Sequence, residues 1–586
     1  MKKRQNGQIM AKVFKKLLFI QIFAVLTATL GSIVDGVIIS NFLGRDAMAA
    51  FSISMPVFVV LACLSNMVGN GAQTICGKAL GKGEGDHVNG VFTLTLVLVG
   101  ALGILFAVLL AAFSDPLAVL LGASGESVPL VADYIRGLSF GALAIMLNGP
   151  IMRFLQLDRA SAFSFVGVLT MTVVNIAGDL LNVFVFKKGM FGMAAATSVS
   201  YYASLLLLST HFFKKDAGIG LSFVKLKLKE MFEIVRIGLP TAISQGCNAL
   251  KSVCLNHIFM GLAGTLFVAA YAGQNTVSQL IQSVSLGVGM TVLLVLSVMV
   301  GEEDRTSLVY TMKSTLKLSI VLNTVIALLV FVGADGLASM FGKGDMETRR
   351  LSAYILRLYA IGLPFSIINT VFQNYFQSIG KMKIVNLICV CHNLLFMVAF
   401  AFVLPKLFGK DSVWLLFPLT QAATLILIVA VVWIHNRSFP RSFEQLLMMD
   451  AGFGVPHEDR IDINVSCIDE VNCAAEQIEE FCRAHGVDEK RTQASALAMK
   501  EMAGNIVQHG FSDGKPHLME GRFTYKEGQL FLRLKDDCEP FNPNEYLETA
   551  DSAETAGHIG IRTVSELVKE MKYQDTFKLN VLTIEI

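Results

Sequence analysis

Charged residues are scarce in this chain. Asp, Glu, Lys and Arg make up 16% of its 586 residues, whereas 54% are hydrophobic, and the mean hydropathy is +0.59. Such a composition excludes an ordinary soluble protein of this length and favours an integral membrane protein. The formal net charge of only +2 argues against a nucleic-acid partner, because such partners select strongly basic surfaces.

Signatures of metal and phosphate binding are also missing. The ten cysteines stand singly, apart from Cys389 and Cys391, so no CxxC spacing predicts a zinc site or a disulfide framework. The chain also lacks a GxxxxGK(S/T) phosphate-binding loop. The missing loop argues against a primary pump driven by ATP hydrolysis.

Long apolar runs instead fill the first three-quarters of the chain. The first run follows a basic N-terminus and is too long for a cleavable signal peptide. Trp414 and Trp433 bracket the last run, and tryptophan prefers the two membrane interfaces. Runs of about 20 or more residues can cross a bilayer as helices. Twelve such spans are predicted, near residues 16–40, 51–77, 88–113, 133–156, 161–186, 190–213, 232–259, 266–300, 311–334, 351–378, 384–408 and 413–434.

The distribution of lysine predicts the orientation in the membrane. The segment 214–229 contains five lysines and the N-terminal tail is also basic, whereas the loops expected on the opposite side are mixed in charge. Positively charged loops stay inside the cell, and an even number of spans brings both ends of the chain to one side. We therefore expect a multi-pass protein of the bacterial cytoplasmic membrane with both termini in the cytoplasm.

The apolar part consists of two similar halves. At an offset of about 220, Gly189 falls on Gly409, and Ala49-Ala50-Phe51 falls on Ala269-Ala270-Tyr271. Matching glycine and polar positions argue against a chance similarity between apolar segments. Two six-span bundles, residues 1–220 and 221–436, are typical of transporters, because alternating access requires two bodies that move against each other.

Polar side chains deep in the spans mark a candidate ion site. Asp35 lies late in the first span, Asn175 and Asp179 lie four residues apart on one face of the fifth, and Thr197 follows in the sixth. Buried charge in a membrane is usually functional, so we predict a proton or sodium site. Simple solvation near the interface is the alternative, and it suits Asp35 better than Asp179. The repeat supplies a control, since the equivalent positions of the second half are Leu255, Leu395 and Ala399.

The first 436 residues resemble the multidrug and toxic compound extrusion (MATE) family, from about residue 10 onward. The resemblance rests on the ordered segments VDGVIISNFLGRDAMAA, GNGAQTICGKALGKGEGD, NIAGDLLNVFVFKKGMFGMAAATSVS and IGLPTAISQGCNAL. It implies export of organic, often cationic, compounds against an inward flow of H⁺ or Na⁺. It also implies that the cation site of the family's N-terminal lobe corresponds here to Asp35, Asn175, Asp179 and Thr197.

The second bundle departs from some members of that family. Where some relatives carry an acidic residue in the seventh span, this chain has only Gln245 and Asn248, which argues against a second cation site. His392 and Asn393 in the eleventh span are interpreted as partners in hydrogen bonds between helices. Few cationic residues are evident that would face the cavity, which argues against a related group of flippases for lipid-linked substrates.

The last quarter of the chain reads as a charged, independent domain. After a linker, residues 437–457, the segment 458–586 alternates between strand and helix patterns and is long enough for one core. Strands are predicted at 460–465, 522–525, 529–535 and 579–585, and helices at 470–485, 492–509 and within 558–573.

Three motifs in this domain predict a nucleotide site. Glu501 and Asn505 lie one helical turn apart, where the Asn505 amide can bind Mg²⁺ and Glu501 can accept a proton or orient water. Asp536 ends a strand and can accept a hydrogen bond from an adenine amino group. Gly557 and Gly560 precede a helix whose N-terminal amides can bind phosphates. Each motif is weak alone, and their order makes the pattern specific.

The ordered segments EMAGNIVQHGF, DDCEPFNP and GHIGIRTV resemble the histidine-kinase-like ATPases, specifically the anti-sigma-factor serine kinases. The resemblance implies a Bergerat-type α/β sandwich that binds ATP and Mg²⁺, with Asn505 as metal ligand and Glu501 as candidate catalytic base. One position departs from the family, because Cys538 stands where glycine is usual. A domain retained only for docking is the alternative interpretation.

Together the two parts predict an α-helical membrane transporter of twelve spans with a C-terminal ATP-binding α/β domain. The favoured function is an antiporter, coupled to H⁺ or Na⁺, that exports small organic or cationic compounds under regulation by this domain. Two alternatives stay open. One is a membrane-anchored serine/threonine kinase that uses the transporter half as a sensor and acts on a cytoplasmic protein, and the other is a lipid-linked-substrate flippase. Membrane lipid is an expected partner, and nucleic acid is not.

Overall fold

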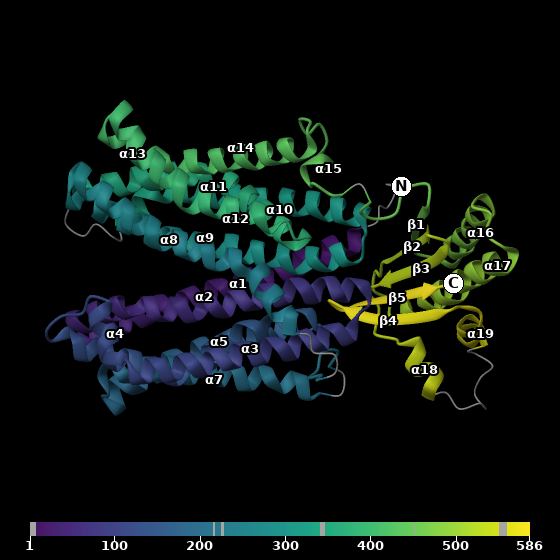
Figure 1. Cartoon of the computed structure of the whole chain (residues 1–586), viewed down its shortest axis with the longest axis horizontal. Helices are drawn as coiled ribbons and strands as arrows, with labels where there is room; N and C mark the ends of the chain where they lie inside the picture. Colours follow the sequence, from purple (N-terminus) through teal and green to yellow (C-terminus); the bar gives the residue numbers. More distant parts are fainter. Residues whose placement is uncertain (1–6, 215–216, 224–227, 340–345, 451, 550–558) are drawn as a thin grey trace.

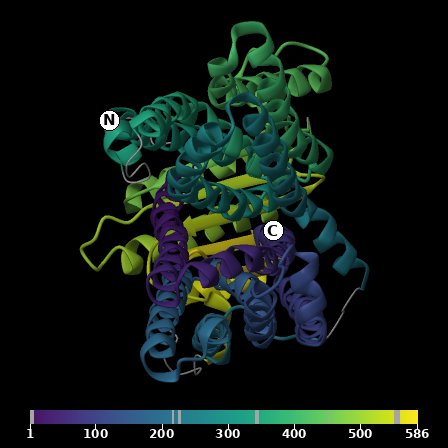
Figure 2. The same cartoon turned by 90° about the vertical axis from the view of Figure 1, so that its left-hand side faces the viewer.

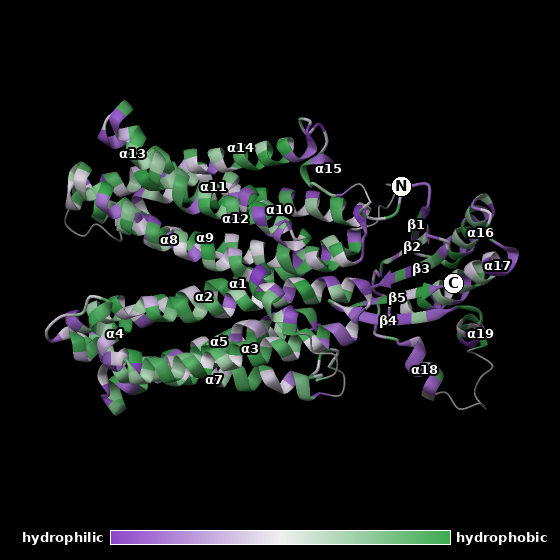
Figure 3. Cartoon of the chain, viewed as in Figure 1, coloured by the Kyte–Doolittle hydropathy of each residue, from purple (hydrophilic) through white to green (hydrophobic). Residues whose placement is uncertain are grey.

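The molecule consists of two long helical bundles that lie side by side and a small α/β domain at one end of them (Figure 1). The computed structural model describes residues 7–214, 217–223, 228–339, 346–450, 452–549 and 559–586. Hydrophobic residues dominate the bundles, whereas hydrophilic residues gather in the α/β domain and where it meets the bundles (Figure 3). The change of character predicted near residue 436 is therefore also a spatial boundary.

The N-terminal bundle contains six long helices and one short helix. The backbone leaves α-helical geometry for a single π-turn at the end of the first and fifth of the long helices, at Ile39–Leu43 and Asn182–Phe186. The helices are α1 (Gln8–Ile38), α2 (Arg45–Lys82), α3 (Gly85–Ala112), α4 (Ser114–Leu120), α5 (Ser127–Leu157), α6 (Ser161–Leu181) and α7 (Gly189–Ser209).

The C-terminal bundle repeats this arrangement. Helices α1, α2 and α3 begin at residues 8, 45 and 85, and α8, α9 and α10 begin 220 residues later, at 228, 265 and 305. The paired glycines Gly189 and Gly409 both have left-handed backbone, with φ of +58° and +87°, which is inexpensive only for glycine. The predicted repeat is thus confirmed. The helices of the C-terminal bundle are α8 (Leu228–Ala263), α9 (Thr265–Gly301), α10 (Arg305–Ser339), α11 (Met346–Ile379), α12 (Met382–Val390), α13 (Phe396–Phe408) and α14 (Leu416–Asn436).

Each of the twelve predicted spans coincides with a long helix, α12 and α13 being halves of one span joined by the π-turn η4 (Cys391–Leu395). Among the described residues, eleven helices are long and apolar enough to cross a membrane. The twelfth, α8, has 36 residues but contains no membrane-length stretch as apolar as those of the other eleven. Its polarity has a structural cause, because its polar residues follow one face that lines a cavity.

The two tryptophans that bracket the last span differ in exposure, and Trp414 does not face lipid. Its side chain is fully buried inside the C-terminal bundle, with ring centroids 4.8 Å and 5.0 Å from those of Phe259 and Phe267. Trp433, at the other end of the span, is 53% exposed, as an interfacial residue requires. Composition alone does not distinguish a tryptophan facing lipid from one that fills a gap between helices.

The two bundles pack backbone to backbone at the end that faces the α/β domain. A Cβ atom added to Gly81 of α2 would lie 2.1 Å from the Val298 carbonyl oxygen of α9, and one added to Gly301 would lie 2.1 Å from the Lys78 carbonyl oxygen. Small residues here let backbones pack directly against each other. The space between the bundles is therefore closed at this end.

The α/β domain is built on an antiparallel sheet of five strands in the order β1-β2-β3-β5-β4. The predicted strands are confirmed, whereas β4 was missed and included in a helical segment. The strands are β1 (Arg460–Val465), β2 (Met519–Lys526), β3 (Gln529–Asp536), β4 (Glu570–Thr576) and β5 (Leu579–Glu585). Helices pack against one face of the sheet, namely α16 (Ile468–Ala484), α17 (Glu489–Ala498), which continues through the π-turns η6 (Met499–Ala503) and η7 (Ile506–Gly510), and α19 (Ile559–Leu567).

The opposite face of the sheet contacts the bundles. Seen from the far end of the molecule, the strands cross behind both bundles (Figure 2). The remaining short helices are α15 (Phe443–Leu446), which lies in the linker, and α18 (Pro543–Thr549). The domain therefore touches both halves of the repeat at their closed end.

Candidate functional site

Two carboxylates of the N-terminal bundle share one amide. The Asn175 Nδ2 atom donates hydrogen bonds to Asp35 Oδ1 at 2.6 Å and to Asp179 Oδ2 at 3.5 Å. Asp179 is 1% exposed, and its other carboxylate oxygen has no hydrogen-bond partner within the described part of the chain. The three side chains grouped by sequence reasoning therefore meet in space.

Close helix packing holds this carboxylate cluster, defined as Asp35, Asn175 and Asp179. A Cβ atom on Gly31 of α1 would lie 3.3 Å from the Thr172 side chain of α6. Because α1 and α6 approach this closely, side chains one turn further along each helix are within hydrogen-bonding distance. The cluster thus depends on a small residue at a helix crossing.

Thr197, also predicted for this site, is oriented differently. Its hydroxyl donates to the Met193 carbonyl oxygen of its own helix at 3.3 Å, and no hydrogen bond joins it to the carboxylates among the described residues. Ser200, one turn later on α7, donates to Asn175 Oδ1 at 3.4 Å. Ser200 follows Thr197 by three residues and therefore lies on the same face of the helix, a spacing that the sequence analysis did not use.

The second bundle contains a polar cavity of about 400 Å³. Gln245 and Asn248 of α8 line it, and so do His392 and Asn393. These last two also make the predicted bonds between helices, to Thr424 at 3.0 Å and to Ser244 at 2.9 Å. Two cationic residues, Arg153 and Lys251, also line the cavity.

The predicted nucleotide motifs of the α/β domain are partly assembled. Glu501 and Asn505 lie in the helix that follows α17, where π-turns surround them and widen the backbone. A Cβ atom on Gly560 would lie 1.8 Å from Glu501 Oε2, so the glycine packs directly on this carboxylate. Gly557 lies outside the described residues.

A magnesium ion fits the chemistry of this helix face. Neither the Glu501 side chain nor the Asn505 side chain forms a hydrogen bond to another residue of the described segments, so the carboxylate and the amide oxygen can bind a metal ion. Hard oxygen donors of this kind suit Mg²⁺, which also retains several water molecules and phosphate ligands.

Asp536 lies buried at the end of β3, on the same face of the sheet as the helices. Its Oδ1 atom accepts hydrogen bonds from Asn580 Nδ2 at 2.8 Å and from the Cys538 N–H at 3.0 Å. Burial raises the pKa of this carboxyl group above its ordinary value, although the bond from Asn580 opposes the shift. Cys538 fills the neighbouring space, and a Cβ atom on Gly510 would lie 2.8 Å from its sulfur.

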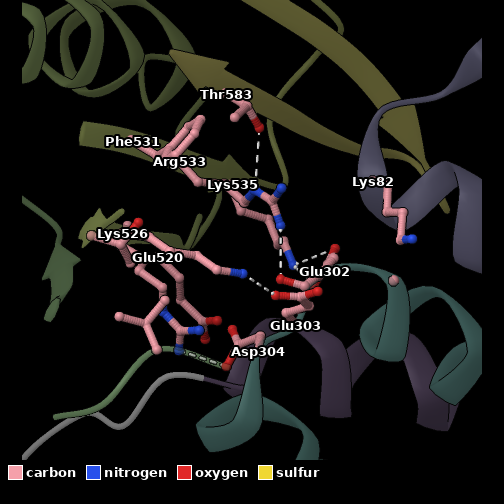
Figure 4. A pocket seen from close by; sticks show the side chains of 15 residues that line it. Lys82, Glu302, Glu303, Asp304, Glu520, Lys526, Phe531, Arg533, Lys535 and Thr583 are labelled. Carbon is pink, nitrogen blue, oxygen red and sulfur yellow. Dashed lines mark hydrogen bonds and ion pairs between the residues drawn. The ribbon is translucent and has the colours of Figure 1, made fainter. Parts of the chain in front are cut away.

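The outward face of the sheet carries four basic side chains and one acidic side chain, and its bases contact the C-terminal bundle (Figure 4). This docking face is defined by Glu520, Arg522, Lys526, Arg533 and Lys535, which share one side of β2 and β3 because strand side chains alternate. Its bases meet three consecutive acids between α9 and α10. Lys535 Nζ lies 2.8 Å and 2.9 Å from the two carboxylate oxygens of Glu302, Arg522 Nη2 lies 2.5 Å from Asp304 Oδ1, and Lys526 Nζ lies 2.9 Å from Glu303 Oε2.

The same domain also binds the N-terminal bundle. Glu520 accepts hydrogen bonds from the backbone N–H groups of Gly7 and Ile9, at 2.9 Å and 3.0 Å, and so caps the start of α1. A carboxylate at this position satisfies free N–H groups and suits the positive end of the helix dipole. Lys12 Nζ lies 2.7 Å from Asp537 Oδ2. One domain therefore bridges both bundles.

A second contact with the N-terminal bundle is buried. Arg159, between α5 and α6, lies with its Nε 2.8 Å from Asp575 Oδ1 of β4, and the Asp575 side chain is 1% exposed. Burial raises the pKa of Asp575 to about 6, although Arg159 opposes the shift. For Asp304, burial alone would raise the pKa, but Arg522 and Lys535 lower it below its ordinary value.

Comparison with known proteins agrees with both parts of the chain. The MatE family matches residues 21–181 and 240–403, together more than half of the chain. The histidine kinase-like ATPase domain matches residues 467–586.

Similar proteins cover the membrane part. The multidrug export protein MepA of Staphylococcus aureus (strain MSSA476) is 24% identical over 440 residues, which cover 72% of this chain and 95% of that protein. The corresponding protein of Staphylococcus saprophyticus is 23% identical over 438 residues, covering 73% and 95%.

Solved structures show the same fold. An outward-facing multidrug resistance MATE family transporter of the MOP superfamily has a TM-score of 0.68 and 21% identity, covering 74% of this chain and 98% of its own. A MOP superfamily transporter from Pyrococcus furiosus, for which a reverse polarity of the binding pocket is described, has the same TM-score and identity and covers 77% and 100%. This chain belongs to the MatE family, has the MATE transporter fold and ends in a histidine kinase-like ATPase domain.

Proposed function

We propose that this protein is an antiporter that exports small organic molecules across the bacterial cytoplasmic membrane in exchange for H⁺ or Na⁺. The observation that carries the proposal is the carboxylate cluster, in which Asp35 and Asp179 approach one amide. The names of the related multidrug export proteins support a small-molecule substrate. We place the ATPase domain and both termini in the cytoplasm, where ATP is available.

The charge of the cluster explains why a cation would bind there. Two carboxylates close together in a membrane cannot both stay ionised without a balancing positive charge. Asn175 is neutral, so it supplies hydrogen bonds but no charge. A proton or a sodium ion would complete the site, and its entry and release would accompany the opening of the bundles to either side.

Replacement of one carboxylate tests the coupling. Everted membrane vesicles that contain the full chain are given a proton or sodium gradient and either 5-carboxyfluorescein or rhodamine 123. We expect Asp179→Asn to reduce gradient-driven uptake of the transported dye at least tenfold. Asp46→Asn serves as the matched control, because Asp46 is an exposed carboxylate of the same bundle. Uptake in Asp179→Asn equal to that of the control would contradict the proposed coupling site.

The ATPase domain is proposed as a regulator rather than a motor. The consecutive residues 535–537 carry this part of the proposal. Lys535 contacts Glu302 of the C-terminal bundle, and Asp537 contacts Lys12 of the N-terminal bundle. Asp536 lies between them and faces the nucleotide motifs on the opposite side of the sheet. A nucleotide that binds at Asp536 would therefore act on the strand that joins both bundles.

In this proposal, Asn505 would hold Mg²⁺ and Asp536 would bind the adenine. The metal would balance phosphate charge, while the protein orients the nucleotide. Binding would change how firmly the domain bridges the bundles and hence how readily they part. Both a gain and a loss of transport are compatible with this role, so nucleotide binding itself is tested first.

The binding test uses the purified full-length protein and a fluorescent ATP analogue, with and without Mg²⁺. We expect Asn505→Ala to abolish the Mg²⁺-dependent part of binding. Gln493→Ala, an exposed amide of α17, should leave binding unchanged. Equal binding by Asn505→Ala and the wild-type protein would exclude Asn505 as the metal ligand.

A further inference from the structure

The cavity of the C-terminal bundle has an unusual charge balance. It has a volume of about 400 Å³ and is lined by residues from both bundles, including Asn66 and Asn70 of α2. Among its described lining residues are the bases Arg153, Lys251 and His392, many amides and hydroxyls, and no aspartate or glutamate. A cavity for an organic cation would be expected to offer carboxylates, whereas this one offers only the aromatic rings of Tyr271, Tyr359 and Phe417 beside its neutral polar groups.

One face of α8 supplies much of this polar lining. Thr241, Ser244, Asn248, Lys251 and Leu255 all line the cavity, and their spacings of three or four residues place them on one side of the helix. This polar stripe also explains why α8, unlike the other eleven long helices, contains no stretch apolar enough to be recognised as a membrane span. The membrane tolerates these residues because they face a cavity rather than lipid.

Arg153 is buried next to this stripe without an acidic partner. It is 6% exposed, and its guanidinium donates to Asn70 Oδ1 at 2.9 Å, to the Gly149 carbonyl oxygen at 3.0 Å and to Asn66 Oδ1 at 2.8 Å. All three acceptors are neutral, and no ion pair of Arg153 occurs among the described residues. A guanidinium has five N–H donors, so two of them stay available to a ligand.

Lys251 is half-buried and likewise lacks an acidic partner among the described residues. Its ammonium group donates to Asn248 Oδ1 at 2.8 Å and forms no ion pair within the described segments. An ammonium group has three donors, so two are free. Burying a cation without an opposite charge costs several kcal/mol, roughly, even after the surroundings relax. Two such cations in one cavity would be balanced by a ligand that carries negative charge.

We infer that this cavity binds the exported compound through an anionic group, a carboxylate or a phosphate, that pairs with Lys251, while Arg153 adds a second positive charge to the same cavity. The amides around it bind the neutral polar part of the compound. The inference rests on the proposed export function and narrows its substrate class. It replaces the sequence-based expectation of cationic substrates, because a positive charge in this cavity would meet only like charges and neutral groups.

The energetics of export agree with this assignment. A cell interior that is negative favours the exit of an anion by about 2.3 kcal/mol per charge for each 100 mV. Entry of a proton or sodium ion at the carboxylate cluster is favoured by the same potential. The two bundles thus separate an acidic site for the entering cation from a basic site for the leaving anion.

The test compares two dyes with the same xanthene ring system. 5-Carboxyfluorescein is anionic and rhodamine 123 is cationic, and fluorescence anisotropy measures their binding to the purified full-length protein. We expect the wild-type protein to bind carboxyfluorescein at least tenfold more tightly than rhodamine 123. Benzoate or phenyl phosphate should displace the bound dye, and the more effective of the two identifies the preferred group, whereas benzylamine should not displace it.

Variants of Lys251 connect binding to the cavity. Lys251→Gln should weaken carboxyfluorescein binding about tenfold or more, as expected for loss of a charge-assisted hydrogen bond. Lys251→Arg should restore most of the affinity, and Lys251→Glu should reverse the preference between the dyes. The control is Lys317→Gln, since Lys317 is exposed on α10 and does not line the cavity.

Several outcomes would overturn the inference. These are tighter binding of rhodamine 123, absence of carboxyfluorescein binding, displacement by benzylamine, or unchanged affinity in Lys251→Gln. Uptake into everted vesicles distinguishes failure of the anionic-substrate inference from failure of the proposed export function. Gradient-driven uptake of rhodamine 123 alone would leave the antiporter intact and reject the anionic substrate, whereas uptake of neither dye would count against both.

Discussion

The ion pair between Lys535 and Glu302 is the contact on which docking of the ATPase domain is expected to depend most. Both side chains are nearly buried, at 7% and 6% exposure, and the ammonium group contacts both carboxylate oxygens. At 2.8 Å, an effective dielectric constant of 20 gives an attraction of about 6 kcal/mol before desolvation is subtracted. Removal of one partner leaves a buried charge, which costs about 3–5 kcal/mol.

We therefore predict that Glu302→Gln and Lys535→Gln each weaken docking by about 3 kcal/mol, or abolish docking where its total free energy is smaller than this. The domain would then detach and hydrate the remaining charge. Hydrogen exchange, followed by mass spectrometry, measures this in the full-length protein. The N–H groups of Gly7 and Ile9, which are bonded to Glu520, should exchange about 100-fold faster, since 1.4 kcal/mol corresponds to a factor of ten.

The matched control is the pair Lys526–Glu303, which joins the neighbouring strand β2 to the same loop but is 46% and 44% exposed. Such exposed pairs contribute about 0–1 kcal/mol, so Glu303→Gln should change exchange less than about fivefold. The double variant Glu302→Gln/Lys535→Gln should lose less than the sum of the single losses, because it leaves no unpaired charge. Unchanged exchange in the single variants, or strictly additive losses, would refute the reasoning.

Three further predictions follow from other contacts. Gly301→Ala should reduce transport more than tenfold, because its Cβ atom would lie 2.1 Å from a backbone oxygen of α2, whereas Gly333→Ala, with no atom within 4 Å, should have no effect on the same vesicle assay. Burial in the docked state raises the pKa of Asp575 to about 6, so the stability that this group gives to docking is fully present below its ordinary pKa and is lost as the pH rises through 6. Protection from hydrogen exchange in the docked segments, measured relative to the intrinsic exchange rate at each pH, should therefore be greater at pH 5 than at pH 7.5. Asp575→Asn should remove this part of the pH dependence, and greater protection at pH 7.5 would contradict the burial argument. Cys538→Gly should strengthen nucleotide binding about threefold or more if the side chain crowds the nucleotide, and unchanged titration of the fluorescent analogue would show that it does not.

Much of the fold was predictable because local patterns determine it. A helix that crosses a bilayer needs about 20 apolar residues, so the spans are visible in the sequence, and the repeat with its paired glycines Gly189 and Gly409 follows from direct comparison of the halves. The same holds for the carboxylate cluster, since Asn175 and Asp179 share a helix face at a spacing of four residues. The strand β4 was missed because its pattern follows directly after a helix without a clear turn signal.

The sequence by itself determined the membrane class, the two bundles, the ATPase domain and the residues of the carboxylate cluster. Each of these follows from composition, periodicity or ordered motifs within one segment. Only the tertiary structure decided that Trp414 is buried, that Arg153 and Lys251 face one cavity without an acidic partner, and that Lys535 meets Glu302 across 233 residues of sequence. The physical reason is that periodicity records which residues share a face of a helix or strand, whereas the charge balance of a cavity depends on what every other element brings to that face.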